Sequence, residues 1–352
     1  RHGRIETGGR IRYRSIPTNM LFFPGLNSPI DPNAGGWATY REIIPALYSN
    51  YVYESNKVEL EAGIRLEYVK VEYEVNPDHN TYTSDGYDYA QPFPNIRLAY
   101  KFDAKNKISF FYNRRVDRPN EVDIRIFPKY DEPELLKVGN PTLRPQFTNS
   151  FEIGYRNNWN KGSLYTSVYH KITDETITRI ATIVPGNTLI YNIFQNAGKS
   201  VATGIETVWQ QEFSKKWTSN LGVTIYRNTI RAFTVQNKYP VPTVYSASEE
   251  NITSGNLKLN NTIRLPRSAD LQLSVVYLAP DLLPQGKIES RFSIDFGFKK
   301  LVQQGKREWF VNATDVLGTL RIKRQIRGNG FTYNSTDYLE SQVFRVGYGW
   351  KF

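Results

Sequence analysis

The 352-residue chain contains no cysteine, one methionine and three histidines. Without cysteine, neither a disulfide framework nor a thiolate metal site is possible. The histidines, His2, His79 and His170, have no second histidine or carboxylate at the spacing of metal ligands. We interpret His79 as a polar loop residue, with an outer-loop metal or ligand site as the alternative. The sequence therefore predicts no metal and no cofactor.

Long apolar runs are also missing. No stretch of about 18 apolar residues occurs, which excludes a transmembrane helix. The chain does not open on a secretory signal, and because Arg4–Arg14 already reads as a strand, we expect it to begin inside a larger protein. No nucleophile-elbow, phosphate-loop or dinucleotide motif is present. We therefore expect no catalytic residues and no enzymatic activity.

Aromatic residues are abundant, with 24 Tyr, 19 Phe and 6 Trp, and the strongest pattern is alternation with a period of two. In the last strand, apolar Phe344, Val346 and Tyr348 alternate with Arg345 and Gly347. The segments around residues 60–68, 217–225 and 292–298 repeat this pattern. Apolar and aromatic residues on one face, with charges and glycines on the other, are typical of a lipid-facing barrel wall.

The net charge of +11 raises nucleic acid as a partner. The Lys and Arg residues are spread along strands and loops and do not form one patch. We interpret them as parts of basic loops and of a polar inner wall, and we expect no nucleic-acid partner.

The connections between the predicted strands alternate in length. Short polar turns are expected at 54–57, 103–106, 158–162, 214–216, 266–269 and 303–306, and long loops at 17–39, 76–90, 119–140, 235–251 and 279–287. This arrangement is that of an outer-membrane barrel with periplasmic turns and extracellular loops. The sequence thus predicts an all-β fold, a transmembrane antiparallel up-and-down β-barrel with about 14 strands, located in the cell outer membrane. The seven strand pairs should begin near Arg4 and Tyr40, Lys57 and Pro92, Lys107 and Arg144, Gly162 and Leu189, Lys216 and Ile252, Asp270 and Ser290, and Arg307 and Asp337.

Closure of the barrel depends on the first and last strands. An unpaired edge in lipid leaves backbone N–H and C=O groups without partners. The alternation of Arg4–Arg14 is too weak to fix a register against Gln342–Phe352. We therefore expect no ladder between these two segments, so that the chain forms an arc and not a closed ring.

Several motifs resemble those of TonB-dependent outer-membrane receptors. Residues 139–146, Gly-Asn-Pro-Thr-Leu-Arg-Pro-Gln, followed by residues 151–155, resemble the family's G-N-P-x-L-x-P-E…E-x-G-Y signature, with Gln146 in place of the usual Glu. Residues 196–206 are similar to its N-x-G-K…G-x-E hairpin, residues 111–119 to its S-R-R-x-x-R-P strand end, and residues 314–318 to its D-x-F-N segment. The matching positions are Gly139, Asn140, Pro141, Leu143, Pro145, Glu152, Gly154, Asn196, Gly198, Gly204 and Glu206. Tyr348, Trp350 and Phe352 resemble the C-terminal aromatic signal read by the barrel-assembly machinery.

The resemblance covers essentially the whole chain and is strongest to the outer-membrane β-barrel family common in Bacteroidetes. It implies a single transmembrane β-barrel domain over 1–352, the C-terminal part of a 22-stranded barrel, without the plug domain. The implied function is a receptor-transporter that binds a solute or polymer with its extracellular loops and admits it by TonB-dependent gated passage. The implied partners are outer-membrane lipid and lipopolysaccharide, the barrel-assembly machinery, and TonB through a missing N-terminal region. The alternatives are a barrel that scaffolds a surface lipoprotein, a secretion complex or an insertion complex, and a passive 14-stranded channel.

Two sets of loop residues and one set of glycines have open interpretations. The acidic run Asp123, Asp131, Glu132 and Glu134 is interpreted as a solvated loop, with a Ca²⁺ or substrate site as the alternative. The tyrosines Tyr82, Tyr87, Tyr89 and Tyr130 fit a membrane girdle or stacking on ligand rings. The glycines of the polar faces, Gly154, Gly204, Gly222, Gly297, Gly347 and Gly349, fit wall curvature or close packing of a plug.

Overall fold

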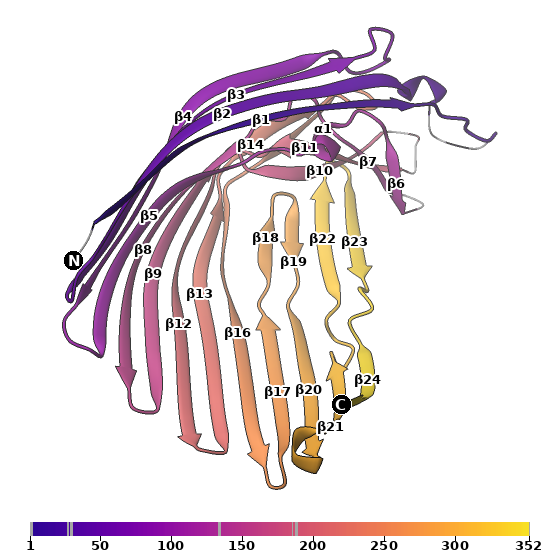
Figure 1. Cartoon of the computed structure of the whole chain (residues 1–352). Coiled ribbons are helices and arrows are strands. Elements are labelled where there is room, and N and C mark those ends of the chain that lie inside the picture. The colour runs from indigo at the N-terminus through magenta and orange to yellow at the C-terminus, as the bar shows by residue number, and fades with distance from the viewer. Residues whose placement is uncertain are drawn as a thin grey trace.

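The computed structural model describes residues 3–26, 28, 31–132, 135–184, 186 and 189–351. Within them, fourteen strands form one antiparallel sheet in which each strand pairs with the next wall strand along the chain (Figure 1). These strands are β1 (Arg4–Met20), β2 (Gly36–Glu54), β3 (Val58–Val75), β4 (Asp85–Lys101), β5 (Asn106–Asp117), β8 (Gln146–Trp159), β9 (Gly162–Asp174), β12 (Ser200–Ser214), β13 (Trp217–Ile230), β16 (Glu250–Leu265), β17 (Ala269–Leu278), β20 (Arg291–Val302), β21 (Arg307–Thr314) and β24 (Val343–Trp350). The predicted all-β fold with about 14 wall strands is confirmed.

Three smaller sheets are built from the long connections. The first contains β6 (Lys129–Glu132), β7 (Leu135–Val138), β10 (Ile177–Ile183) and β11 (Ile190–Asn196). The second contains β14 (Phe233–Asn237) and β15 (Thr243–Ala247), and the third β18 (Asp281–Leu283), β19 (Gly286–Ile288), β22 (Ile322–Gly328) and β23 (Phe331–Asp337). The helical turns are η1 (Pro32–Ala34), α1 (Glu121–Ile124) and η2 (Gln303–Gly305). No helix in the described part of the chain is long and apolar enough to cross a membrane.

The six short turns fall where the sequence predicts them, so the strand pairs they join are confirmed. The sequence-based prediction is wrong on the opposite side of the wall. The strand expected to begin near Leu189 is β11, which pairs in parallel with β7, and the wall strand of that pair is β12, beginning at Ser200. Likewise the last wall strand begins at Val343 and not near Asp337. The wall strands β2 and β4 begin earlier than expected, at Gly36 and Asp85, because their ends extend beyond the apolar part of the wall.

The outward face of the wall is apolar and exposed. Leu273 of β17 pairs with Phe296 of β20, and the two side chains are 39% and 38% exposed. The same face carries exposed Ile11, Leu47, Leu66, Leu98, Ile153, Val168, Ile205, Ile225, Val311 and Val346. Exposed apolar side chains over so many consecutive strands would aggregate in water, and they fit a wall whose outward neighbours are lipid chains.

Aromatic side chains mark the outward face at the short-turn end. Tyr51, Tyr100, Phe102, Tyr155, Phe213, Trp217, Trp309, Tyr348 and Trp350 are exposed there. Towards the long-loop end, the outward face of β2 and β3 becomes charged, with Arg41 bound to Glu74 at 2.7 Å and Lys70 bound to Glu72 at 2.6 Å. An aromatic belt followed by an apolar band and then by ion pairs is the layering expected across a membrane.

The inner face carries the charges. Glu42, whose side chain is 1% exposed, accepts hydrogen bonds from Arg12 Nε and Tyr40 Oη, both at 2.6 Å, and also pairs with Arg14. Glu59 binds Lys101 at 2.7 Å and thereby joins two wall strands. These contacts satisfy the charges that the lumen side of the wall would otherwise leave unpaired.

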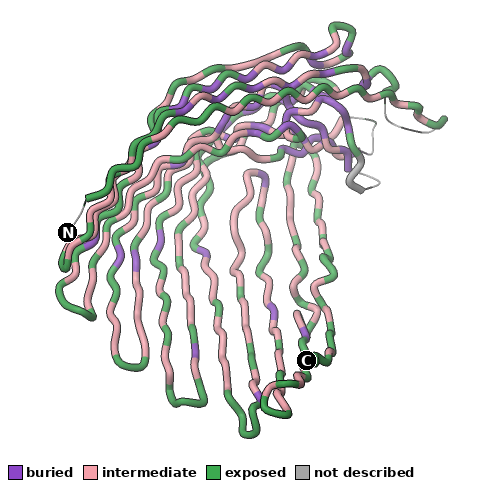
Figure 2. The backbone as a smooth tube through the Cα atoms, viewed as in Figure 1, coloured by how far each residue is buried: buried purple, intermediate pink, exposed green. Residues whose placement is uncertain are grey.

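The strands β1 and β24 are the two ends of the sheet order, and among the described residues no register joins them. The wall is therefore a partial barrel. Figure 1 shows it as a curved sheet with the two termini on separate edges. Figure 2 shows that buried residues concentrate where the loop strands lie against the upper parts of β1 to β4.

Candidate functional site

The loop sheets and α1 form an assembly on the inner face of the wall, at the long-loop end. Its core joins Tyr40, Val69 and Tyr73 of the wall to Ile126 and Leu136 of the loops, all of them at most 3% exposed. Side chains of β7 and β11 alternate between the side that faces the wall and the side that faces away from it. Those that face the wall are buried and form the loop half of this hydrophobic core. The side of the first loop sheet that faces away from this core carries Lys137 and Asn192 beside Leu135 and Ile190, which makes this region the candidate ligand-binding surface.

The family motif at 139–146 holds the assembly to the wall. Pro141, Leu143 and Pro145 are buried, and Leu143 has no exposed area. A methyl group on Gly139 would overlap the backbone of Arg125, and the Gly139 N–H donates to the Arg125 carbonyl at 2.9 Å. Tyr82 Oη donates to the Gly139 carbonyl at 3.0 Å. Glycine is required here because two loop segments meet without space for a side chain.

The two receptor-like motifs, which are separate in sequence, lie against each other. Asn140 Nδ2 donates to the Phe194 carbonyl at 2.9 Å. Asn196 Oδ1 accepts from the Arg144 backbone N–H, and Asn196 Nδ2 donates to the Arg144 carbonyl, both at 2.9 Å. An asparagine that meets both backbone groups of another segment replaces a β-bridge between them. Gln146 also takes part, because its Oε1 accepts from the Ile177 N–H at 2.7 Å.

The other motif residues lie in the wall or in its connections. Glu152 and Glu206 lie on the inner face, and Glu152 accepts a hydrogen bond from Tyr165. Gly198 adopts a φ of +63°, which favours glycine, in the turn that leads into β12. Asp315, 1% exposed, accepts from the Thr319 N–H at 3.0 Å and fixes the chain after β21.

Two of the inner-face glycines are covered by aromatic rings of neighbouring strands. A methyl group would overlap the ring of Tyr165 at Gly154 and the ring of Phe310 at Gly347. At Gly204 it would overlap the Ile225 carbonyl oxygen, the Tyr226 Cβ and the Tyr169 hydroxyl. Gly222 and Gly349 have space for a methyl group, with nearest atoms at 3.9 and 3.8 Å, whereas at Gly297 the Asn312 Oδ1 lies at 3.3 Å and would have to shift. Ring packing is therefore a sufficient reason for glycine at Gly154 and Gly347.

Three of the tyrosines expected to form a girdle or to stack on a ligand, Tyr82, Tyr87 and Tyr89, pack against the inner core. Tyr82 is 3% exposed and stacks on Tyr239 with ring centroids 6.2 Å apart, and burial raises the pKa of Tyr82. Tyr87 packs under the guanidinium of Arg144, and Tyr89 Oη accepts from Arg118 Nε at 2.9 Å. The membrane-girdle alternative is wrong for these three residues, because their rings pack against the inner core and not on the lipid face. Stacking of Tyr87 and Tyr89 on a ligand stays a prediction. The side chain of Tyr130 lies outside the described residues.

His79 is a buried turn residue. Its Nδ1 accepts from the backbone N–H groups of Thr81 and Tyr82, at 3.1 and 3.0 Å, and burial lowers its pKa. Within the described residues, no group of His, Asp and Glu side chains could hold a metal ion. Of the acidic run, Asp123 closes the capping box of α1, while the side chains of Asp131, Glu132 and Glu134 lie outside the described residues, as does His2. His170 is on the outward face, with its Nδ1 2.7 Å from Thr203 Oγ1.

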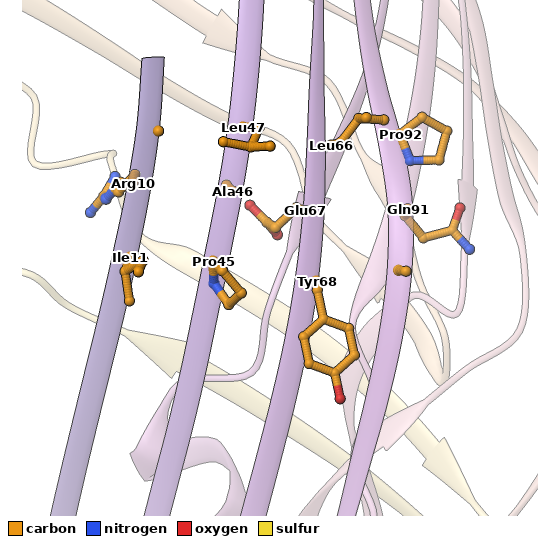
Figure 3. Close-up of a pocket in the computed structure, with 12 residues that line it drawn as sticks. Arg10, Ile11, Pro45, Ala46, Leu47, Leu66, Glu67, Tyr68, Gln91 and Pro92 are labelled. Atoms are coloured by element: carbon orange, nitrogen blue, oxygen red, sulfur yellow. The ribbon is translucent and has the colours of Figure 1, made fainter.

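The wall has an outward hollow of ≈ 960 Å³ near its charged rim (Figure 3). It is lined by Ile11, Leu47, Leu66 and Tyr68 beside the small or rigid residues Gly9, Pro45, Ala90 and Pro92. Because this lining is on the lipid-facing side, the hollow lies outside any path through the barrel.

A second cavity, of ≈ 480 Å³, lies between the first and third loop sheets. Its charged lining residues are Lys137, Arg179, Arg324 and Asp337. Sequence reasoning missed this site because the four residues come from three separate connections and match no motif. Their meeting depends on which loop strands pair across long sequence distances.

The predicted assembly signal is on the last wall strand. Tyr348 and Trp350 are 45% and 55% exposed on the outward face, and Phe352 lies outside the described residues. Trp309 of β21 packs against Tyr348 with ring centroids 4.7 Å apart. The final strand therefore presents its aromatic side chains to the lipid side.

A model of the outer membrane protein beta-barrel family matches residues 1–350. Among solved structures, the ferric yersiniabactin uptake receptor FyuA from Yersinia pestis is similar, with a TM-score of 0.64, 13% identity, and coverage of 99% of this chain and 51% of that one. The copper transporter OprC is similar with a TM-score of 0.67 and 12% identity, and the match covers 99% of this chain and 55% of that one. The ferric-catecholate import receptor Fiu from E. coli K12 is similar with a TM-score of 0.64 and 13% identity, and the match covers 98% of this chain and 51% of that one. At such identities the similarity shows the fold, and the chain spans about half the length of these structures. No curated protein matches the sequence.

Proposed function

Because the chain belongs to the outer membrane protein beta-barrel family, we propose that it is the wall of a gated receptor-transporter in the cell outer membrane. It binds a solute with the connections at its long-loop end, which face the extracellular side. The solute is then admitted along the polar inner face, with energy transmitted by TonB. The partners of this wall are lipid and lipopolysaccharide on its outward face, and the barrel-assembly machinery at its last strand.

The observation that carries this proposal is the inward folding of the loops. A passive pore of fourteen strands requires an open lumen and a ladder between β1 and β24, and the described residues contain no such ladder. Here the first loop sheet and α1 pack on the inner face and share a hydrophobic core with β2 and β3. An inner face covered at one end favours gated passage over free diffusion. The similar solved structures are named as receptors and transporters, which favours binding and passage over catalysis.

The test is depletion of solutes from growth medium by the natural host, measured by untargeted mass spectrometry. We expect at least one solute to be depleted by the wild-type strain and to remain when the gene is deleted or when TonB is absent. Complementation with the full gene should restore depletion only in the strain that has TonB. Equal depletion with and without the gene would contradict a transport role, and depletion that needs the gene but not TonB would indicate a passive channel.

A further inference from the structure

Four neighbouring wall strands carry a row of polar residues on their outward face. Thr203 of β12 pairs with His170 of β9 on one side and with Arg227 of β13 on the other, and Arg227 also pairs with Thr253 of β16. Residues that lie opposite each other in a ladder share a face, so these four side chains form one polar row. His170 Nδ1 lies 2.7 Å from Thr203 Oγ1, which holds the imidazole ring beside the residue that pairs with Arg227.

The polar row lies at the boundary of the apolar band. On β13, Arg227 comes ten positions after Trp217 of the aromatic belt, and on β12, Thr203 comes ten positions before Phe213 of the same belt. At a rise of about 3.3 Å per residue and a strand tilt of about 40°, ten residues cross about 25 Å of membrane. The apolar band of an outer-membrane barrel is about 25 Å tall. The polar row is therefore at the depth where the lipid headgroups of the leaflet at the long-loop end begin.

Arg227 is a cation without a carboxylate. Its Nη2 donates to Asn251 Oδ1 at 3.1 Å, and it has no ion pair with any residue in the described ranges. Arg231, four residues farther along the chain, is bound to Glu249 at 2.6 Å. A guanidinium has five N–H donors in a planar fork that matches the oxygens of a phosphate group. The single bond to an amide leaves most of the Arg227 donors for an anionic group.

An apolar hollow of ≈ 470 Å³ lies on the outward face beside the polar row. Its lining includes Arg227 together with the apolar side chains of Val168, Ile205, Val223 and Ile225. Val168, Ile205 and Ile225 are each at least 50% exposed, so the hollow is open to the lipid. A cation at headgroup depth next to a hollow in the apolar band matches a molecule that has an anionic head and an alkyl chain.

The larger outward hollow of Figure 3 lacks this combination. Its lining is also apolar, but the cations of the charged rim near it are neutralised, Arg41 by Glu74 at 2.7 Å and Lys70 by Glu72 at 2.6 Å. Such ion pairs leave little charge to attract an anion. Charge complementarity therefore favours the hollow beside Arg227 as the site of an anionic lipid.

We propose that this surface binds one lipid of the surrounding membrane through the phosphate of its headgroup. Arg227 binds the phosphate oxygens, the hydroxyls of Thr203 and Thr253 flank the phosphate, and an acyl chain lies in the hollow along Ile205 and Ile225. The inference goes beyond the proposed transport, because it concerns the outward face and needs only the location of the wall in the outer membrane.

The test is native mass spectrometry of the full protein in a mild non-ionic detergent, titrated with lipid. The probes are dioleoyl phosphatidate and dioleoylglycerol, which has the same acyl chains and no phosphate. Inorganic phosphate in a parallel titration separates the lipid from a free anion. We expect saturable binding of one phosphatidate, about tenfold tighter than that of dioleoylglycerol, and no saturable binding of inorganic phosphate at equal concentrations.

Two pairs of variants test the headgroup and the chain separately. Arg227→Gln should weaken phosphatidate binding roughly tenfold, the typical effect of losing one charge-assisted hydrogen bond. Arg231→Gln removes the same charge where the arginine is bound to Glu249, and should change the dissociation constant less than about twofold. Thr207→Trp puts an indole ring into the lining of the hollow and should weaken binding without removing a charge, whereas Leu98→Trp adds the ring to the outward face of β4 and should leave binding unchanged.

The outcomes that would overturn the proposal are distinct. Equal binding of phosphatidate and dioleoylglycerol, equal effects of Arg227→Gln and Arg231→Gln, or equal effects of Thr207→Trp and Leu98→Trp would each contradict it. Inorganic phosphate bound as tightly as phosphatidate would show a site for a free anion and not for a lipid. Because binding in detergent needs neither TonB nor uptake, its failure leaves the transport experiment unaffected.

Discussion

Leu273 and Gln272 are consecutive residues of β17 that face opposite environments. Leu273 is on the outward face beside Phe296, and Gln272 is on the inner face opposite Gly297. Leu273→Arg places a charge in lipid near the middle of the strand and should lower the free energy of unfolding by about 2–4 kcal/mol. Gln272→Arg should cost much less, because the inner face is polar. Urea unfolding of both variants in lipid vesicles measures the difference, and equal losses would mean that the two faces are wrongly assigned.

This alternation could be predicted from the sequence because a period of two needs only local information. The environment of single loop side chains could not be predicted from the sequence. Tyr82 and His79 occur in a polar segment, yet both are buried, since the segment folds under residues that are distant in sequence. The rings that cover Gly154 and Gly347 belong to adjacent strands, so no local pattern reveals them.

At the scale of elements, Gly139 packs directly against the backbone of Arg125, so that two loop segments are in close contact. Gly139→Ala puts a methyl group against the Arg125 backbone and should destabilise the first loop sheet by about 1–3 kcal/mol. Gly222→Ala is the matched control, because its nearest neighbour, the Lys258 carbonyl oxygen, lies 3.9 Å away. Hydrogen exchange of the amides of β6 and β7 is the measurement. Faster exchange in Gly139→Ala alone is expected, and identical exchange in both variants would show that the contact does not hold the sheet.

The sequence located the short turns correctly because polar turn residues interrupt the apolar alternation at each of them. It misassigned β11 because strands of a loop sheet alternate with the same period as wall strands. The two kinds of strand differ in the strand they pair with. Ile190 of β11 pairs with Leu135 of β7, which lies 55 residues earlier in the sequence, and not with a wall strand. The charged cavity was beyond sequence reasoning for the same reason.

For the whole molecule, the lack of cysteine allows a direct test of how the wall lies in the membrane. Asn251 is near the long-loop end of β16, and Lys306 follows η2 in a short turn. In intact cells, an impermeant maleimide should label Asn251→Cys and should label Lys306→Cys only after the outer membrane is permeabilised. Labelling of Lys306→Cys but not of Asn251→Cys in intact cells would contradict the orientation, and with it the placement of the loop assembly where a receptor meets its solute.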